Sequence, residues 1–489
     1  MKAASQKGSP LSCLFTAVEA DPFVKVGGLG DVAYALPHAL RNLHPDEIGQ
    51  RQIDVRLAIP CHSSVCDAVD HVLDKLTFTV NTHMGEINTL VYVTEINGLP
   101  IYIISSPLIP QDTLVYSNDN YIDGLKFLFF SQATLALLDH LNWKPDILHV
   151  NDWHTAITPY LLKRQISNGA ATHTRSVLTI HNLPFLGTET ETAFKDLGIP
   201  PSRDKNLPSW ARKLPLPIGL ANSDSIVAVS PTYAAEILTS EFGCGLEEYL
   251  GTRQDALSGI INGIDTHLWN PASDAEIFVN YSIKTLHARP NNKHTLQNEF
   301  HLNLEPGVPL LAFIGRMQKQ KGVDLILEGL HLCKDLPWQA ILLGKGDPLF
   351  EKNAIQLQSE FPGRVQSIIQ YDSKLSRRIY AGADVLLMPS RYEPCGLAQM
   401  IAMRYGCLPL ARATGGLKDT ITGYHEDSAH ATGFLFEEET PQALANTIQQ
   451  ALEVYKDQDQ WHAMQVNAMR KDFSWHQSAL KYAKLYMGQ

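Results

Sequence analysis

The fold class of this chain is decided by the stretch PLLAFIGRMQKQKGVDLILEGLHLC, residues 309–333. A short apolar run ends at Gly315, a polar loop follows, and helical periodicity begins at Val323. A buried strand followed at once by an amphipathic helix is the repeating unit of a parallel sheet covered by helices. The stretch therefore predicts a βα unit whose loop lies at the carboxyl end of its strand.

The same alternation of apolar runs and helical patterns continues on both sides of this unit. The second half adds QAILLG, QSIIQ, DVLLMP and CLPLA, and the first half contains CLFTAV, VRLAIP, LVYVTEI, IYIIS, ILHV, VLTI and IVAV. Several runs precede long helical patterns, such as GLKFLFFSQATLALLDHL. Two such series predict an α/β protein of two doubly wound, Rossmann-like domains with parallel sheets, and we expect a ligand in a deep cleft between them.

A cluster of Gly, Asn, Pro and Asp in INGIDTHLWNPASD, residues 261–274, marks the predicted break between the domains. We place the first domain at 1–265, the second at 266–470, and a terminal helix in 471–489. Ala479, Tyr482, Ala483 and Tyr486 share one face of that helix. The helix is therefore expected to pack back on the first domain.

Composition excludes several classes of protein. The 489 residues are 44% hydrophobic and carry a formal net charge of −11, which argues against a general binder of nucleic acid or anionic membranes. No run approaches the ~20 apolar residues of a membrane span. The apolar stretch after Lys7 is short and interrupted, so we interpret it as a first strand and not as a signal peptide.

The seven cysteines form neither a disulfide framework nor a zinc site, because the single close pair, Cys61 and Cys66, has no matching second pair. A reducing compartment, the cytoplasm, is therefore the expected location. No H-E-x-x-H or other metal-ligand spacing occurs, so we expect no metal held by the protein.

Two loops are candidate anion sites. In VKVGGLGDV, Gly27 and Gly28 stand beside Lys25 directly before a helical pattern, where the first amides of a helix attract negative charge. The alternative is a plain turn between a strand and a helix. In the second loop, Arg316 and Lys321 follow a strand and could clamp a diphosphate. The alternative there is a solvated basic loop.

Further polar side chains follow other strands. In MPSRYEPCGLAQM, Glu393 precedes Pro394, Cys395 and Gly396, which we expect to open a helix whose amides bind a phosphate while the carboxylate binds sugar hydroxyls. The alternative is that Glu393 only favours the helix dipole.

In the first half, Asp152 and His154 follow ILHV, and His181 and Asn182 follow VLTI. Polar groups at the ends of neighbouring parallel strands form the usual site of an α/β enzyme. The alternative is that His154 and His181 are structural residues. No third residue completes a nucleophile triad with these pairs.

Nine motifs occur in one order along the chain. They are KVGGLGDV (25–32), NDWHT (151–155), IHNL (180–183), VSPTYAAEI (229–237), EFGCGLEEYL (241–250), LSGIINGID (257–265), GRMQKQKG (315–322), SRYEPCGLAQM (390–400) and TGGLKDT (414–420). This set resembles the bacterial glycogen synthases and plant starch synthases of glycosyltransferase family 5. The resemblance implies a GT-B fold and a retaining glucosyltransferase that moves glucose from ADP-glucose to the non-reducing end of an α-1,4-glucan. The first domain would lie on the acceptor side, and the second would bind the nucleotide sugar.

By the same resemblance, residues of known role in the family map onto this chain. The catalytic set would be Lys25, Asp152, His181, Arg316, Lys321 and Glu393. The substrate-binding set would be Gly27, Gly28, Asn262, Tyr371, Cys395, Gly396 and Leu397, with Tyr371 stacking on the adenine. No cofactor is implied, since ADP-glucose is the donor substrate, and the only expected partners are this donor and a glucan or maltooligosaccharide.

The chain departs from related patterns at three places. Other nucleotide-sugar transferases carry a second glutamate where this chain has Ile401, and glycogen and starch synthases lack it as well. The segments SRDKNLPSWARKLPLPIGLANSD (202–224) and SSPLIPQDTLVYSND (105–119) differ from most relatives. Both belong to the acceptor side, so three hypotheses stay open: the glucan synthase, a transferase with another nucleotide sugar or a small acceptor, and a catalytically silent glucan-binding protein.

Overall fold

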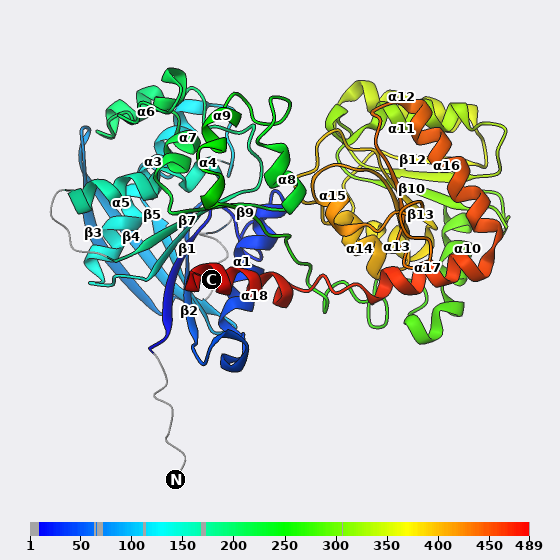
Figure 1. The fold of residues 1–489 in the computed structure, drawn as a ribbon, viewed down its shortest axis with the longest axis horizontal. Helices are drawn as coiled ribbons and strands as arrows, with labels where there is room; N and C mark the ends of the chain where they lie inside the picture. The colour runs from blue at the N-terminus through cyan, green and yellow to red at the C-terminus, as the bar shows by residue number, and fades with distance from the viewer. Residues whose placement is uncertain are drawn as a thin grey trace, which may run out of the picture. The chain divides into compact units, whose positions relative to one another are not determined.

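The chain forms two compact units, Met1–Gly263 with Trp475–Gln489, and Ile264–Ser474. The computed structural model describes residues 9–62, 65, 72–110, 114–167, 173–305 and 307–488. Each unit contains a sheet with helices packed on it (Figure 1). The predicted α/β class with two Rossmann-like domains is confirmed, whereas the cleft expected between them stays a prediction.

The described part of the first unit carries a nine-stranded sheet in the order β3-β4-β5-β2-β1-β6-β7-β8-β9. β1 lies in the middle and runs parallel to β2 and β6, with Leu11 beside Ile53 and Cys13 beside Ile147. Parallel pairing continues from β6 through β9, so these strands end at the same edge of the sheet. The strands are β1 (Leu11–Thr16), β2 (Ile53–Pro60), β3 (Asp74–Thr82), β4 (Gly85–Ile96), β5 (Leu99–Ser105), β6 (Ile147–Asn151), β7 (Arg175–Ile180), β8 (Ser225–Ala228) and β9 (Leu257–Gly259).

One part of this sheet contradicts the expectation of purely parallel pairing. β3 and β4 are antiparallel, and so are β4 and β5. Short connections force this arrangement, because a parallel pair needs a crossover of a dozen or more residues. Asn97 and Gly98 join β4 to β5 with φ of 49° and 79°, as a tight hairpin turn of this type requires.

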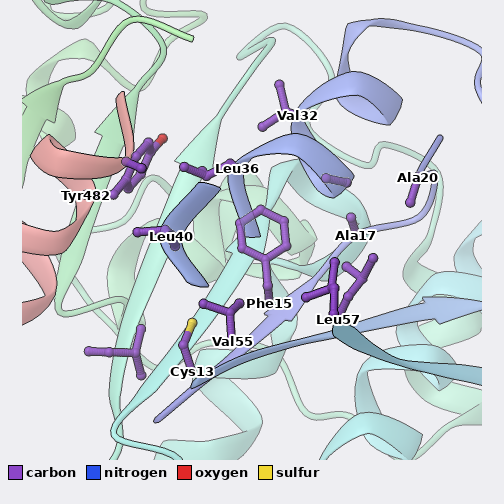
Figure 2. Packing of buried hydrophobic residues seen from close by; sticks show 14 of the residues in the cluster. Cys13, Phe15, Ala17, Ala20, Val32, Leu36, Leu40, Val55, Leu57 and Tyr482 are labelled. Carbon is purple, nitrogen blue, oxygen red and sulfur yellow. The ribbon is translucent and has the colours of Figure 1, made fainter. Parts of the chain in front are cut away.

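Helices cover both faces of the first sheet. They are α1 (Gly28–Arg41), α3 (Asn120–His140), α4 (Asp152–Thr155), α5 (Ile157–Ser167), α6 (Glu191–Asp196), α7 (Pro215–Asn222), α8 (Pro231–Glu236), α9 (Glu247–Gly251) and α18 (Trp475–Met487). Figure 2 shows side chains of β1, β2 and α1 interlocking, among them Phe15, Val55 and Leu36. Burying each such side chain contributes roughly 1.5–3 kcal/mol, which fixes the loop between β1 and α1 from both ends.

The terminal helix α18 completes this core and packs along α1. Its Ala479, Tyr482, Ala483 and Tyr486 are fully buried. The Tyr486 hydroxyl contacts His149 Nδ1, and His149 Nε2 lies 2.7 Å from Thr179 Oγ1. The last residues of the chain therefore stabilise the sheet that carries the candidate site of the first unit.

The described part of the second unit contains a six-stranded sheet in the order β12-β11-β10-β13-β14-β15, with every pair parallel. Its strands are β10 (Leu310–Ile314), β11 (Gln339–Leu343), β12 (Val365–Ile368), β13 (Val385–Met388), β14 (Leu408–Arg412) and β15 (Phe434–Phe436). Its helices are α10 (Pro290–Glu299), α11 (Val323–Leu332), α12 (Pro348–Glu360), α13 (Ser373–Gly382), α14 (Ala398–Arg404), α15 (Gly415–Thr420), α16 (Pro441–Lys456) and α17 (Gln458–Arg470). The quoted stretch 309–333 folds as the predicted βα unit, β10 followed by α11.

Cys61 corrects a second expectation, because it is disulfide-bonded. A single disulfide bond needs no framework of several pairs, which is all that the cysteine spacing argued against. Cys66 and residues 111–113 of the divergent segment lie outside the described residues. No helix of the described chain is long and apolar enough to cross a membrane.

Candidate active site

Asp152 and His181 come together at the carboxyl ends of β6 and β7. Asp152 Oδ1 accepts hydrogen bonds from the backbone amides of His181, at 2.7 Å, and Asn182, at 3.2 Å. Asp152 begins α4 with φ of 51°, a left-handed conformation that costs energy for a residue with a side chain. This strained backbone conformation directs the Asp152 carboxylate toward the end of the neighbouring strand β7.

The enclosed end of the sheet shifts the titration of both groups. Burial raises the pKa of Asp152 to about 7, against the lowering effect of the two amides, so the carboxyl is partly protonated at neutral pH. Burial lowers the pKa of His181 to about 3, so its imidazole is neutral. His181 Nε2 lies 2.9 Å from Asn151 Oδ1 and donates to it, which leaves Nδ1 as an acceptor.

In the loop between β1 and α1, two backbone amides already have a partner within the protein, while the anion site expected at Gly27 and Gly28 stays a prediction. The amides of Val26 and Gly27 both donate to Glu19 Oε2, at 2.6 and 2.9 Å, so they are not available to a bound anion. Lys25 Nζ lies 2.5 Å from Asp31 Oδ1. The amides of Gly28 and Leu29, at the start of α1, have no hydrogen-bond partner within the described chain.

Several buried polar atoms around this edge lack a partner in the part of the chain that the structure describes. They are the Oδ1 atoms of Asn182 and Asn262 and the Nδ1 atom of His154. A buried acceptor without a donor costs about 1–3 kcal/mol, which a ligand hydroxyl would offset. The place of Asn262 near the glucose stays a prediction, and the unpartnered atoms of Asn182 and His154 are further polar groups at this edge.

In the second unit, Lys321 and Glu393 form an ion pair. Lys321 Nζ lies 2.6 Å from Glu393 Oε2, and the Ser390 hydroxyl donates to the same oxygen at 3.0 Å. The two residues come from the loops after β10 and β13, which are neighbours in the sheet. Arg316 lies in the loop of Lys321, is exposed, and makes no ion pair with any described residue.

The segment after Glu393 differs from the prediction that Pro394 opens a helix. α14 begins only at Ala398, and Gly396 has φ of 73°, so Cys395, Gly396 and Leu397 form an irregular turn ahead of it. This left-handed glycine cannot continue into a regular helix turn, which explains the later start. The amides of these residues therefore do not belong to the first turn of a helix.

Two glycines of α15 support this turn. A Cβ atom at Gly415 would lie 2.0 Å from the Glu393 carbonyl oxygen, and one at Gly416 would lie 2.0 Å from that of Cys395. The Gly416 amide donates to the Glu393 carbonyl at 3.1 Å. The segment TGGLKDT thus holds the backbone of Glu393 in place.

Tyr371 follows β12 and is 87% exposed. It lies at the same edge of the sheet as Arg316 and Glu393, because β12, β10 and β13 are parallel. Its expected stacking on an adenine remains a prediction. Among the described residues no group of three or more His, Cys, Asp or Glu side chains is arranged to hold a metal ion.

Sequence reasoning missed two residues of the first unit, Glu19 and Tyr116. Glu19 closes the apolar run CLFTAV, so the rule that selected Asp152 at the end of its strand would have selected it too. Tyr116 donates to Glu19 Oε1 at 2.5 Å from a position 97 residues away. No local pattern signals that contact.

Comparison with known proteins links both units to one group of enzymes. Residues 12–252 match the family model described as "Starch synthase catalytic domain", and residues 296–465 match "Glycosyl transferases group 1". A glycogen synthase of Caldicellulosiruptor bescii is 38% identical over 97% of this chain and 99% of its own length. A glycogen synthase of Nitrosomonas europaea is 39% identical over 97% and 96%.

Solved structures give the same result. The catalytic domain of starch synthase IV from Arabidopsis thaliana, bound to ADP and acarbose, matches with a TM-score of 0.85 and 32% identity over 98% of this chain and 99% of that chain. Sucrose-phosphate synthase from Thermosynechococcus elongatus matches with a TM-score of 0.61 and 19% identity, a likeness of fold alone.

Proposed function

The chain belongs to the glycogen synthase and starch synthase family, and on this premise we propose that it is a retaining glucosyltransferase that elongates an α-1,4-glucan from ADP-glucose. One observation carries the proposal: over almost its full length the chain matches a starch synthase domain bound to ADP and acarbose. ADP is the product that ADP-glucose leaves behind. Acarbose is an oligosaccharide that resembles the acceptor.

Roles for the residues of the second unit follow from their environment. The guanidinium of Arg316 has no ion-pair partner in the described chain and is available to the leaving diphosphate. Lys321 is held by Glu393 at 2.6 Å, so its ammonium is oriented before the donor arrives. Glu393 would bind glucose hydroxyls through its remaining acceptor capacity. Cations fixed in advance stabilise the charge that develops on the departing phosphate.

The residues of the first unit suit the sugar. Asp152 is fixed by two backbone amides, so we assign it to holding a glucose hydroxyl and not to forming a covalent intermediate. His181 is neutral and offers its Nδ1 to a hydroxyl donor. The proposal requires Lys25 and the free amides of Gly28 and Leu29 to act on the same donor as the second unit.

The proposed reaction is front-face displacement. The acceptor hydroxyl forms a bond to C1 of glucose on the face from which the phosphate oxygen departs, and its proton passes to that phosphate. Retention of configuration follows without a protein nucleophile. We propose that the reaction needs no cofactor or metal, which a measurement of turnover in the presence of EDTA would check. A cytoplasmic location stays a prediction.

Turnover assays test this proposal. We expect the purified chain to release nucleotide faster from ADP-glucose than from UDP-glucose, and to lengthen both glycogen and maltotriose. Turnover only with another nucleotide sugar, or only with a monosaccharide acceptor, would replace the proposal by the second hypothesis. Absence of turnover with every donor, together with binding of glycogen, would show the silent glucan-binding protein.

A further inference from the structure

Glu19 is a buried carboxylate in the loop that follows β1, with 2% of its surface exposed. Its Oε2 atom accepts the amides of Val26 and Gly27, and its Oε1 atom accepts the hydroxyl of Tyr116. Hydrogen bonds to a charged group are stronger than those between neutral groups. Three of them hold this charge in the interior, where an unpaired carboxylate would be strongly disfavoured.

The bonds of Glu19 differ from those of an ordinary helix cap. A capping side chain accepts the amides of the second or third helical residue. Glu19 instead accepts the amides of Val26 and of Gly27, the residue before α1 begins, and leaves those of Gly28 and Leu29 unpartnered within the described chain. Its contacts therefore fix the direction in which the loop enters the helix, while they keep the helix end open to a ligand.

The loop is shaped around this carboxylate. A Cβ atom at Gly30 would lie 3.2 Å from Glu19 Oε2 and 3.1 Å from Lys25 Cγ, so the missing side chain gives both groups room. Lys25 lies directly before the amides that Glu19 binds, and its ammonium is paired with Asp31. The position of Lys25 thus depends on the anchor at Glu19.

We infer that Glu19 is a positioning residue for the donor: it holds the 25–30 loop so that Lys25 and the amides of Gly28 and Leu29 meet the sugar nucleotide. The inference rests on the proposed function and names a residue that this function did not use. In this role Glu19 itself would touch no substrate. It acts through the backbone that it binds and through Tyr116, which ties the loop to the segment before α3.

The test compares Glu19→Ala and Glu19→Gln with a matched control, Asp146→Asn. Asp146 is a carboxylate of the same unit that also binds the backbone, accepting the amide and hydroxyl of Ser12 at the opposite end of β1. We expect Glu19→Ala to lower kcat/KM for ADP-glucose about 100-fold, the loss typical of reacting groups displaced by ~1 Å. For Asp146→Asn, kcat/KM should stay within about 3-fold of the value of the unmodified chain, even if its Tm falls as much as that of Glu19→Ala.

Glu19→Gln provides a readout that a purely structural role would not change. Glutamine can accept the two amides and face Tyr116 with its NH2 group, so the shape survives and the charge is lost. Glu19 is one cause of the raised pKa of Asp152, whose carboxyl also interacts with Tyr116 and accepts the backbone amide of His181. The limb of the pH–rate profile that belongs to Asp152 should therefore move to lower pH in this variant, and not in Asp146→Asn.

Hydrogen exchange separates this inference from the proposed function. The amides of Val26 and Gly27 should exchange at least 10-fold faster in Glu19→Ala, and this measurement needs no turnover. If the unmodified chain processes no nucleotide sugar, the proposed function fails while the exchange result still decides whether Glu19 anchors the loop. Activity of Glu19→Ala within 3-fold of the unmodified chain, or unchanged exchange, overturns the inference.

Discussion

Lys321→Ala tests the centre of the second unit. The substitution removes the ammonium that lies 2.6 Å from Glu393 and leaves that carboxylate with the Ser390 hydroxyl as its recorded side-chain donor. Two effects follow from one change. The leaving diphosphate loses a cation that is already oriented, and Glu393, which is 9% exposed at its side chain, loses its counter-charge.

The two effects have different sizes. Losing one preorganised donor to a developing charge lowers kcat by about 10²–10³, or ~2.7–4 kcal/mol in the transition state. Leaving a buried charged acceptor partly unsatisfied costs about 2 kcal/mol of folding free energy. For a domain of this size that corresponds to a fall of roughly 4–8 °C in Tm. The variant should therefore stay folded at 25 °C and be nearly inactive.

The assay is ADP release from saturating ADP-glucose with glycogen as acceptor, read beside a thermal melt. Lys319→Ala is the matched control, because it removes the same charge from an exposed position of the same loop, and we expect it to lose less than about 3-fold. If Lys321→Ala keeps kcat within 10-fold of the unmodified chain, or if Lys319→Ala loses as much, the assignment of Lys321 is wrong.

Three further substitutions test other contacts. Gly415→Ala places a Cβ atom 2.0 Å from the Glu393 carbonyl at φ of 45°, and should lower kcat/KM at least 10-fold; normal activity would show that this loop tolerates displacement. Asp152→Asn should abolish a limb near pH 7 in the pH–rate profile. Because the pKa of Asp152 is higher in the folded than in the unfolded state, its contribution to the free energy of unfolding falls as the pH rises from about 4 to 7. Urea titrations of Asp152→Asn should lack this fall in the free energy of unfolding. Tyr486→Phe leaves His149 Nδ1 without its recorded partner and should cost about 1–3 kcal/mol in urea unfolding, with activity per folded molecule unchanged.

The sequence predicted most strands that lie inside the sheets, because continuous apolar runs such as DVLLMP have no other place to be buried. It missed β3, an edge strand whose side chains alternate between exposed and partly buried, and the three-residue strands β9 and β15. Apolar-run reasoning cannot detect such strands. The turn at Asn97–Gly98 was a visible hairpin signal, and it would have predicted the antiparallel pair.

Site residues were predictable one at a time and not in their pairings. Asp152, His181, Arg316 and Glu393 each follow a strand, and parallel strands bring their ends to one edge. The bond between Lys321 and Glu393 spans 72 residues, and its geometry depends on the order of strands in the sheet. The order of the strands along the sequence does not determine their order in the sheet.

The glycine-rich motifs of both units make room for contacts within the protein, besides any room that they make for a ligand. Such motifs are generally taken as cradles in which a ligand touches bare backbone. In this chain the protein itself lies close to these glycines: a Cβ atom at Gly415 would be 2.0 Å from the Glu393 carbonyl oxygen, and one at Gly30 would be 3.2 Å from Glu19 Oε2. The missing side chains of these glycines allow Glu19 and Glu393 to pack closely against the backbone. We expect the ligand to meet the groups that Glu19 and Glu393 hold in place. Substituting Gly415 should therefore lower activity by displacing Glu393, whereas an alanine at Gly30 needs a shift of only a few tenths of an ångström and should have a smaller effect.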